Sequence, residues 1–372
     1  MQKYLRRKIL CSILAASICG STSFVLAANS GGEMTTVVIG GGGIESYVGN
    51  NGTGSNNEVY FDVNGGHKRI YVIGSYMVSG DVSSNSVTIN STNVSSVYGG
   101  YTKLGDANYN SVTISDSIVA GNINGGYVSQ GSANYNSVII NSIDGIDGYY
   151  SYIYGGYVND NGSANNNIVI VNDSRVNEIY GGDALQGACD NSVIVYSSEI
   201  KRNIYGGYAN GNSASNNNVV IIDSTAGGYV FGGYADSGEA NNNSVTIAGS
   251  SDLTVASLYG RDNNATGTGN KLVLIDFKGK DGTDTSVKSL NNFDSIEVKA
   301  LGDDKEYTAG QKLTLLTATN TSGTKINNCK VGESIQYALL GTDRVAVEIK
   351  GNAAIEGDNV TFTVEGMQAS RQ

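Results

Sequence analysis

Short apolar runs recur along this chain, and apolar and polar positions alternate within each run. Residues 111–114, SVTI, are the clearest example, because Val112 and Ile114 flank the polar Thr113. Strict alternation predicts a half-buried β-strand, and β-branched residues favour that conformation. We therefore expect Val112 and Ile114 to face a core and Thr113 to face outward. Equivalent runs occur at residues 86–89, 137–140 and 244–247.

A second kind of run ends in a pair of glycines, as in VYGG at residues 97–100. Alternation turns Val97 inward, Tyr98 outward and Gly99 inward. About ten residues separate the two kinds of run, without the two-residue turn signals of a hairpin. A third, weaker strand is expected between them, near Val94, Val176 and Ile200.

The two runs form a unit that recurs in eight clear copies between residues 72 and 276. Each copy carries an asparagine two residues before the first apolar residue of the alternating strand. Successive asparagines are separated by 25, 26, 31, 24, 26, 26 and 27 residues. A near-constant period of this length is typical of stacked repeats, whereas a β-propeller blade needs about 40–45 residues. The asparagines are Asn85, Asn110, Asn136, Asn167, Asn191, Asn217, Asn243 and Asn270.

A single copy cannot bury its apolar face, so the copies must stack. We predict an all-β solenoid in which each coil lies about 4.8 Å from the next and pairs with it through parallel strands. Glycine can adopt positive φ without steric cost, and a glycine that faces inward would let a corner of the coil close tightly. Asparagine would tolerate the left-handed conformation. Stacked in register, the asparagine side chains would also form hydrogen bonds along the stack.

Changes in composition divide the chain into four segments. Residues 1–27 are predicted to be a signal peptide, because four basic residues precede an apolar run and small residues surround Ala27. Residues 28–71 are expected to form an N-terminal cap with a degenerate repeat, and residues 72–276 the β-solenoid repeats. Residues 277–372, which are richer in lysine and arginine, are expected to form a β-rich C-terminal cap that continues the stack and closes it.

Charge and cysteine content narrow the range of partners. The formal net charge is −11, and removal of the four basic residues of the signal peptide leaves −15. Such an acidic surface repels phosphate backbones, so we do not expect nucleic acid as a partner. Cys189 and Cys329 are the two cysteines that follow the signal peptide. Two distant cysteines do not form a disulfide framework, so we expect two isolated thiols.

The repeat resembles the passenger regions of bacterial autotransporters, which are exported by type V secretion. The resemblance rests on IYGGY at residues 204–208 and ANNNSVTI at residues 240–247. The stretches LNNFDSIEV at residues 290–298 and LTLLTAT at residues 313–319 resemble the region that precedes the translocator barrel in that family. The resemblance implies a right-handed parallel β-helix that is exported as an adhesin-like passenger. It brings no catalytic motif and no cofactor with it.

One feature of the family is not found in this sequence, namely the C-terminal membrane barrel. Such a barrel needs many strands of about ten residues with alternating polarity. We expect either a truncated gene product or a separately encoded outer-membrane barrel as a partner. The expected location is the cell surface or the extracellular medium, with the periplasm as the alternative.

Residue patterns for catalysis are weak. Residues 236–238, DSG, resemble a serine-protease nucleophile motif, but they lie in a variable loop, and His67 is the chain's single histidine. A catalytic triad needs a base held by a third group. Carboxylates for a polysaccharide lyase or a glycosidase are scattered singly, and no zinc or phosphate motif is present. We therefore expect no enzyme activity, no metal and no cofactor; the alternative is a polysaccharide-processing enzyme on the same fold. The candidate carboxylates are Asp173, Asp190, Asp223 and Glu239.

The strongest candidates for ligand binding are two rows of tyrosines. Stacked tyrosines offer apolar rings with polar tips, which suit sugar rings or peptide edges, although ring stacking could instead serve only to stabilise the coils. Together with the resemblance, which implies an adhesin-like passenger, we expect a scaffold that binds a glycan or protein of a host or matrix surface. The row after the glycine pair contains Tyr76, Tyr101, Tyr127, Tyr157, Tyr208 and Tyr234, with Asp183 and Arg261 as interruptions. The row before the glycine pair contains Tyr98, Tyr154, Tyr180, Tyr205, Phe231 and Tyr259.

Overall fold

The computed structural model describes residues 45–48, 54–66, 70–143, 152–302, 306–331 and 347–369. All of them belong to one compact unit, Glu33–Gln372. The predicted signal peptide, residues 1–27, lies outside the described residues, and so does His67. In the described part of the chain, no helix has the length and hydropathy needed to cross a bilayer.

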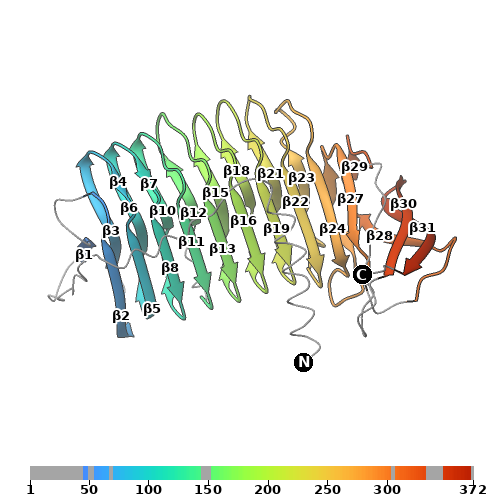
Figure 1. Ribbon diagram of the computed structural model, residues 1–372, viewed down its shortest axis with the longest axis horizontal. Helices are drawn as coiled ribbons and strands as arrows, with labels where there is room; N and C mark the ends of the chain where they lie inside the picture. The colour runs from blue at the N-terminus through green and yellow to red at the C-terminus, as the bar shows by residue number, and fades with distance from the viewer. Residues whose placement is uncertain are drawn as a thin grey trace. The chain divides into compact units, whose positions relative to one another are not determined.

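Two large parallel sheets contain most of the strands, and strands of consecutive coils lie side by side in each (Figure 1). The first, which we call the tyrosine sheet, contains the strands with the glycine pairs. Its order is β1 (Glu45–Val48), β3 (Ile70–Ser79), β6 (Ser96–Leu104), β10 (Ile123–Gln130), β12 (Tyr152–Val158), β15 (Glu178–Ala184), β18 (Ile204–Ala209), β21 (Tyr229–Ala235), β23 (Ser257–Arg261), β26 (Ser289–Asn291) and β29 (Ile326–Asn327).

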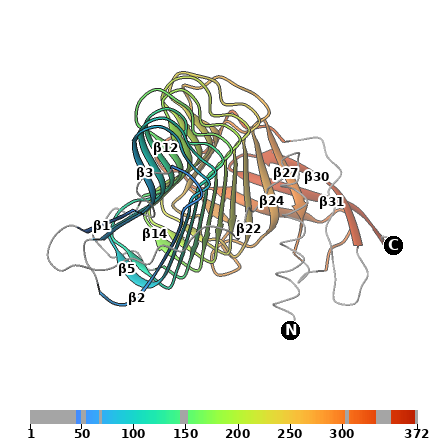
Figure 2. The same ribbon diagram turned by 60° about the vertical axis from the view of Figure 1, so that its left-hand side comes forward.

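The second, which we call the valine sheet, contains the alternating strands that follow each asparagine. Its order is β2 (Glu58–Gly66), β5 (Ser86–Val94), β8 (Ser111–Ser115), β11 (Ser137–Asn141), β13 (Ile168–Asn172), β16 (Ser192–Tyr196), β19 (Asn218–Ile222), β22 (Ser244–Gly249), β24 (Lys271–Phe277) and β27 (Ser295–Ala300), with β9 (Ile118–Val119) paired to β5. Figure 2 shows the same coils following one another from a second direction.

Smaller sheets complete the coils. The predicted third strand is present near Val176 and Ile200 as a separate parallel sheet, whereas Val94 is the last residue of β5. A two-stranded sheet lies at another corner. The three-stranded sheet consists of β14 (Arg175–Val176), β17 (Glu199–Ile200) and β20 (Thr225–Ala226), and the two-stranded sheet of β4 (Val82–Ser83) and β7 (Ala107–Asn108).

The register confirms the predicted all-β parallel solenoid, which has about nine turns of about 26 residues. Val138 pairs with Val112 in the preceding coil and with Val169 in the following coil. Val112 and Ile114 are fully buried, whereas Thr113 is half-buried on the opposite face. Like residues therefore form columns through the core. Burial of each valine or isoleucine side chain stabilises the folded state by roughly 1.5–3 kcal/mol.

The structure brings the eight asparagines together in one column. The Asn136 side-chain oxygen accepts hydrogen bonds from the Asn110 backbone N–H at 2.9 Å and from the Asn110 side-chain amide at 3.1 Å. The Asn136 side-chain amide donates to the Ala107 carbonyl at 2.9 Å and to the Asn167 side-chain oxygen at 3.1 Å. The Asn136 carboxamide thus has both donors and both acceptor positions in use while it is almost completely buried.

The column extends by one residue at each end beyond the eight asparagines. Asn57 donates from its backbone N–H and its side chain to Asn85, and Asn270 donates in the same way to a carboxylate oxygen of Asp294. We call the series from Asn57 to Asp294 the asparagine ladder. The hydrogen bonds between its members all run in one direction, from each coil to the next.

The expected role of positive φ at these landmarks was wrong. The left-handed residue is the one before each ladder asparagine, as at Tyr109 with a φ of 58°. The glycine pair is needed for space instead. A Cβ on Gly99 would lie 2.4 Å from the carbonyl oxygen of Gly125, and a Cβ on Gly100 would lie 2.6 Å from the side-chain amide nitrogen of Asn110. The glycines therefore let the tyrosine sheet approach the asparagine ladder closely.

A second series of side-chain hydrogen bonds, which the sequence did not predict, follows the strands of the valine sheet. We call it the serine ladder. The backbone N–H of Ser174 donates to the Ser198 hydroxyl at 3.0 Å, and that of Ser198 donates to the Ser224 hydroxyl at 3.0 Å. Each of these hydroxyls also donates to the carbonyl two residues before it. The residue preceding each serine is left-handed, as at Asp173 with a φ of 46°.

The C-terminal segment continues the stack and then changes its topology. The two large sheets run past residue 276 through β27 and β29. A four-stranded mixed sheet follows, in which β28 pairs in parallel with β25 and β31 pairs antiparallel with both β28 and β30. The predicted β-rich cap is present as this sheet. Its strands are β25 (Ser286–Val287), β28 (Lys312–Ala318), β30 (Val347–Glu356) and β31 (Asn359–Ala369).

We predict that Asn136→Leu destabilises the protein more than Ser137→Leu does. Leucine has a similar size, but it leaves the Asn110 amide and the Ala107 carbonyl without their partners inside the coil. Each buried group that loses its partner costs about 1–3 kcal/mol, so the midpoint of urea unfolding should fall clearly. Ser137 is half-buried on the outer face of β11, and its replacement should move the midpoint little. Equal shifts for the two variants would contradict a stabilising ladder.

Candidate functional site

The outer face of the tyrosine sheet carries two columns of aromatic side chains. Parallel register places equivalent residues of successive coils next to each other. Both glycines of a pair are buried, which breaks the alternation of the strand and leaves the tyrosines before and after the pair on the same, outer face, while Ile153 and Ile179 are buried. The first tyrosine column lies before the glycine pair and contains Tyr98, Asn124, Tyr154, Tyr180, Tyr205, Phe231 and Tyr259. The second tyrosine column lies after it and contains Tyr76, Tyr101, Tyr127, Tyr157, Asp183, Tyr208 and Tyr234.

The rings form a herringbone over the middle coils. Within the first column, Tyr180 stacks on Tyr154 and Tyr205 with centroid distances of 4.9 and 4.8 Å and interplanar angles of 16° and 14°. Between the columns, Tyr205 and Tyr208 meet edge to face at 5.1 Å and 81°. Both arrangements are favoured by the ring quadrupole and contribute about 0.5–1.5 kcal/mol per pair beyond burial. The stacked rings therefore stabilise the coils and form one continuous aromatic surface.

The tyrosine hydroxyls of this surface stay neutral at physiological pH. Burial, together with the neighbouring Tyr127 and Tyr101, raises the pKa of Tyr98 to about 12, and burial with Tyr234 raises the pKa of Tyr208 to about 12. A neutral phenol both donates and accepts a hydrogen bond. The surface thus offers apolar rings and polar hydroxyls without charge, which suits contact with a sugar or a protein.

Each column has one interruption, and the structure corrects one of the predicted ones. Asn124 takes the place of an aromatic ring in the first column, between Tyr98 and Tyr154. Asp183 interrupts the second column, as the sequence indicates. Arg261 does not lie in that column, because it pairs with Gly233 and thus occupies the position of a second glycine. Its guanidinium donates to the carbonyl of Ala265 instead.

Asp183 is the electrostatically unusual residue of the aromatic surface. Asp183 is half-buried, and neither of its carboxylate oxygens is completely shielded from solvent. Burial, and to a lesser extent the negative Glu178, raise the pKa of Asp183 to about 7. Glu178 lies on the same strand and accepts a hydrogen bond from the Asn203 side chain at 2.7 Å. Asp183 accepts no hydrogen bond and forms no ion pair within the described part of the chain.

The predicted catalytic candidates are not brought together. Asp236 and Ser237 are exposed in the loop after β21, and no described histidine lies near them. Asp173 and Asp223 share one corner of the coils but lie two coils apart, with Ser197 between them. Glu239 lies on a different corner, where it forms a bridge to Ser213. Asp190 directly precedes the ladder residue Asn191.

Metal-ligand side chains do not cluster in the described ranges, where no group of three or more histidine, cysteine, aspartate or glutamate residues is placed to hold an ion. Cys189 and Cys329 are free thiols. Burial raises the pKa of the Cys329 thiol to about 11, which disfavours the reactive thiolate.

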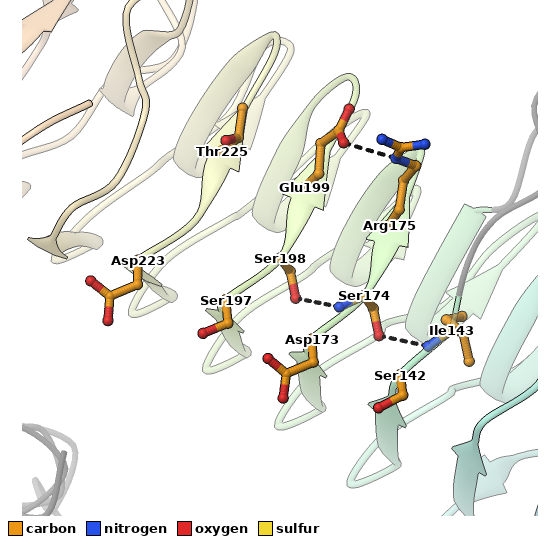
Figure 3. A pocket seen from close by; sticks show the side chains of 10 residues that line it. All are labelled: Ser142, Ile143, Asp173, Ser174, Arg175, Ser197, Ser198, Glu199, Asp223 and Thr225. Atoms are coloured by element: carbon orange, nitrogen blue, oxygen red, sulfur yellow. Dashed lines mark hydrogen bonds and ion pairs between the residues drawn. The ribbon is translucent and has the colours of Figure 1, made fainter. Parts of the chain in front are cut away.

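A shallow groove of about 480 Å³ follows the serine ladder (Figure 3). Its lining is polar and includes Asp173, Asp223 and an ion pair between Arg175 and Glu199 at 2.8 Å. Both partners of the pair are more than 40% exposed, so its contribution to stability is small, about 0–1 kcal/mol. Small-molecule sites usually have largely apolar walls, so the groove is a weaker binding candidate than the aromatic surface.

No protein family, no curated protein and no solved structure matches this chain. The strand register shows the parallel β-solenoid without support from relatives, whereas the resemblance to autotransporter passengers stays a prediction.

We predict that Asp183→Asn flattens the dependence of stability on pH. As the pH rises above the ordinary range of an aspartate pKa, the unfolded chain releases this proton while the folded chain keeps it up to about pH 7. Asp183 therefore lowers the free energy of unfolding as the pH rises, by about 2–3 kcal/mol between pH 5 and pH 8. Urea unfolding of both proteins at these pH values measures the difference.

Asp173→Asn is the matched control, because it removes an exposed carboxylate from another corner of the coil. It should keep the pH profile of the wild type. Parallel profiles for the wild type and Asp183→Asn would contradict the assigned burial of the Asp183 carboxylate.

Proposed function

We propose that this protein is an exported, non-catalytic β-solenoid scaffold that attaches, in the manner of an adhesin, to a glycan or protein of a host or matrix surface. The observation that carries the proposal is the aromatic surface of the tyrosine sheet. Tyr101, Tyr127 and Tyr157 contact one another in sequence, with centroid distances of 4.7 and 5.2 Å. Successive coils therefore present the same chemistry at a regular spacing, which suits an extended ligand.

The arrangement of the acidic residues supports a scaffold over a polysaccharide-processing enzyme. Glycosidases hold two carboxyl groups about 5–9.5 Å apart on either side of the scissile bond. Asp190 and Glu239 lie at other corners, whereas Asp173 and Asp223 line one polar groove from coils two turns apart, roughly 9.6 Å along the axis, which is at the upper limit of that range. No specific observation favours the enzyme.

Export and surface display rest on sequence features. The basic start and the apolar run of residues 1–27 favour passage through the inner membrane. The similarity of the repeat and of residues 290–298 to autotransporter passengers favours display on the cell surface, with a separately encoded outer-membrane barrel as the partner. Retention in the periplasm is the alternative location, and fractionation of the producing cells distinguishes the two.

We predict that Tyr101→Ser, Tyr127→Ser and Tyr157→Ser together weaken attachment. The three changes remove adjacent rings from the second tyrosine column, whereas the core beneath them is unchanged. Binding to immobilised mucin and to immobilised fibronectin, measured by surface plasmon resonance, should fall about tenfold or more. The circular dichroism signal of the β-structure should stay the same.

Two further variants make this test specific. Tyr109→Asn with Tyr135→Asn removes a stacked pair of exposed tyrosines at another corner, where Asn166 and Asn216 occupy the equivalent left-handed position. This control should bind like the wild type. A triple Tyr→Phe variant at the three test positions keeps the rings and remains informative if the serine variant fails to fold. Unchanged binding in the serine variant, or equal losses in the control, would count against a ligand role of the columns.

A further inference from the structure

Asp183 places a carboxylate within the second tyrosine column. It pairs in register with Tyr157 of the preceding coil and with Tyr208 of the following coil. Tyr157 contacts Tyr127 on one side of this position, and Tyr208 stacks on Tyr234 at 4.6 Å on the other. An aspartate is shorter than a tyrosine, so the carboxylate lies closer to the sheet than the phenol groups on either side. The aromatic surface thus contains a single anionic position between two sets of contacting rings.

The surroundings of this carboxylate provide no compensating positive charge. Neither a hydrogen bond nor an ion pair reaches the Asp183 side chain from the residues that the structure describes. The charged group that acts on it is Glu178, which is also negative. The Asn203 amide is directed to Glu178 rather than to Asp183. An anion that is partly removed from water and has no partner is destabilised, and a cation would offset that cost.

The rings around Asp183 also favour a cation. Burial is the main cause that raises the pKa values of Tyr154, Tyr157, Tyr180 and Tyr208, and the charge of Asp183 adds to each of them, so all four rings lie within its electrostatic reach. The faces of aromatic rings carry negative potential and attract ammonium groups within about 6 Å. A carboxylate and several tyrosine rings therefore meet at a position where each attracts the same kind of group.

We propose that Asp183 and the tyrosines around it bind the ammonium group of a lysine side chain presented by a basic protein partner. The inference rests on the proposed function, because it names the ligand chemistry of the same surface. A lysine carries its compact charge at the end of a long apolar stem, so the stem can lie against the phenol rings while the charge reaches the deeper carboxylate. The net charge of −11 adds a general attraction for a basic partner.

Binding of this kind depends on pH in a defined direction. The titratable groups that face Asp183 are Glu178 and Tyr180 on β15, Tyr154 and Tyr157 on β12, and Tyr208 on β18. The pKa values of these tyrosines are raised, so their phenols stay neutral. The pKa of Asp183 is about 7, so the side chain is protonated and loses the negative charge that attracts the ammonium as the pH falls through that value.

The test measures binding of a hexalysine peptide to the immobilised protein at 150 mM salt by biolayer interferometry. Asp183→Asn should weaken binding about tenfold at pH 8, as expected for the loss of a charged partner. Asp173→Asn removes the same charge from an exposed corner, and it should change binding less than about twofold. Binding to the wild type should also fall about tenfold between pH 8 and pH 5.5, whereas Asp183→Asn should show little change.

Three results would overturn the inference. Equal losses for Asp183→Asn and Asp173→Asn would show that only the general negative charge attracts the peptide. Equal binding of hexalysine and its fully acetylated form would exclude an ammonium contact. Tighter, Asp183-dependent binding of a glucosamine hexamer would assign the site to an amino sugar. The assay on mucin and fibronectin is independent of these outcomes, so the proposed attachment can stand when the lysine inference fails.

Discussion

The close fit between the glycine pair and the asparagine ladder is the constraint on which the rest of the structure depends. The space that Gly100 leaves empty is the space next to the Asn110 carboxamide, and Gly126 stands in the same relation to Asn136. A side chain at either glycine would push the tyrosine sheet away from the ladder. The asparagine in turn satisfies backbone groups that the narrow coil removes from water. The two landmarks recur together in the middle coils, whereas Ser75 and Arg261 take the position of the second glycine in the coils of Asn85 and Asn270.

The aromatic surface follows from the same fit. Both glycines of a pair turn toward the ladder, which breaks the alternation of the strand, and the outward positions on either side of the pair then recur in register from coil to coil. Tyrosine at these positions covers its own neighbours, so that Tyr205 is only 8% exposed although it lies outside the core. A surface that is stabilised by its own ring contacts is pre-organised for a ligand. The stabilising and the binding interpretations of the rows are therefore compatible.

Alternation and period predicted the strands, the parallel stacking and the inward residues such as Val112, because these features depend on local sequence alone. The reason for each glycine could not be predicted, since a glycine needed for space and a glycine needed for positive φ look the same in a sequence. Arg261 was assigned to the wrong column because it follows Gly260 where a second glycine is expected, and the sequence does not show that it replaces this glycine rather than a tyrosine. The serine ladder was missed because serine is frequent throughout the chain and Ile143 interrupts the series. The isolation of Asp183 depends on the neighbouring coils, which only the fold brings together.

The direction of the asparagine ladder explains how the stack ends. Every carboxamide donates toward the following coil and accepts from the preceding one, so the dipoles align and strengthen one another. The last member of such a series has to accept two hydrogen bonds and has no following carboxamide to which it could donate. Asp294 meets this requirement, because a carboxylate accepts hydrogen bonds and donates none. Soon after Asp294, the parallel sheets give way to a mixed sheet whose antiparallel strands β30 and β31 need no further coil to complete their pairing. The change from asparagine to aspartate therefore coincides with the change from a repeating to a closing topology.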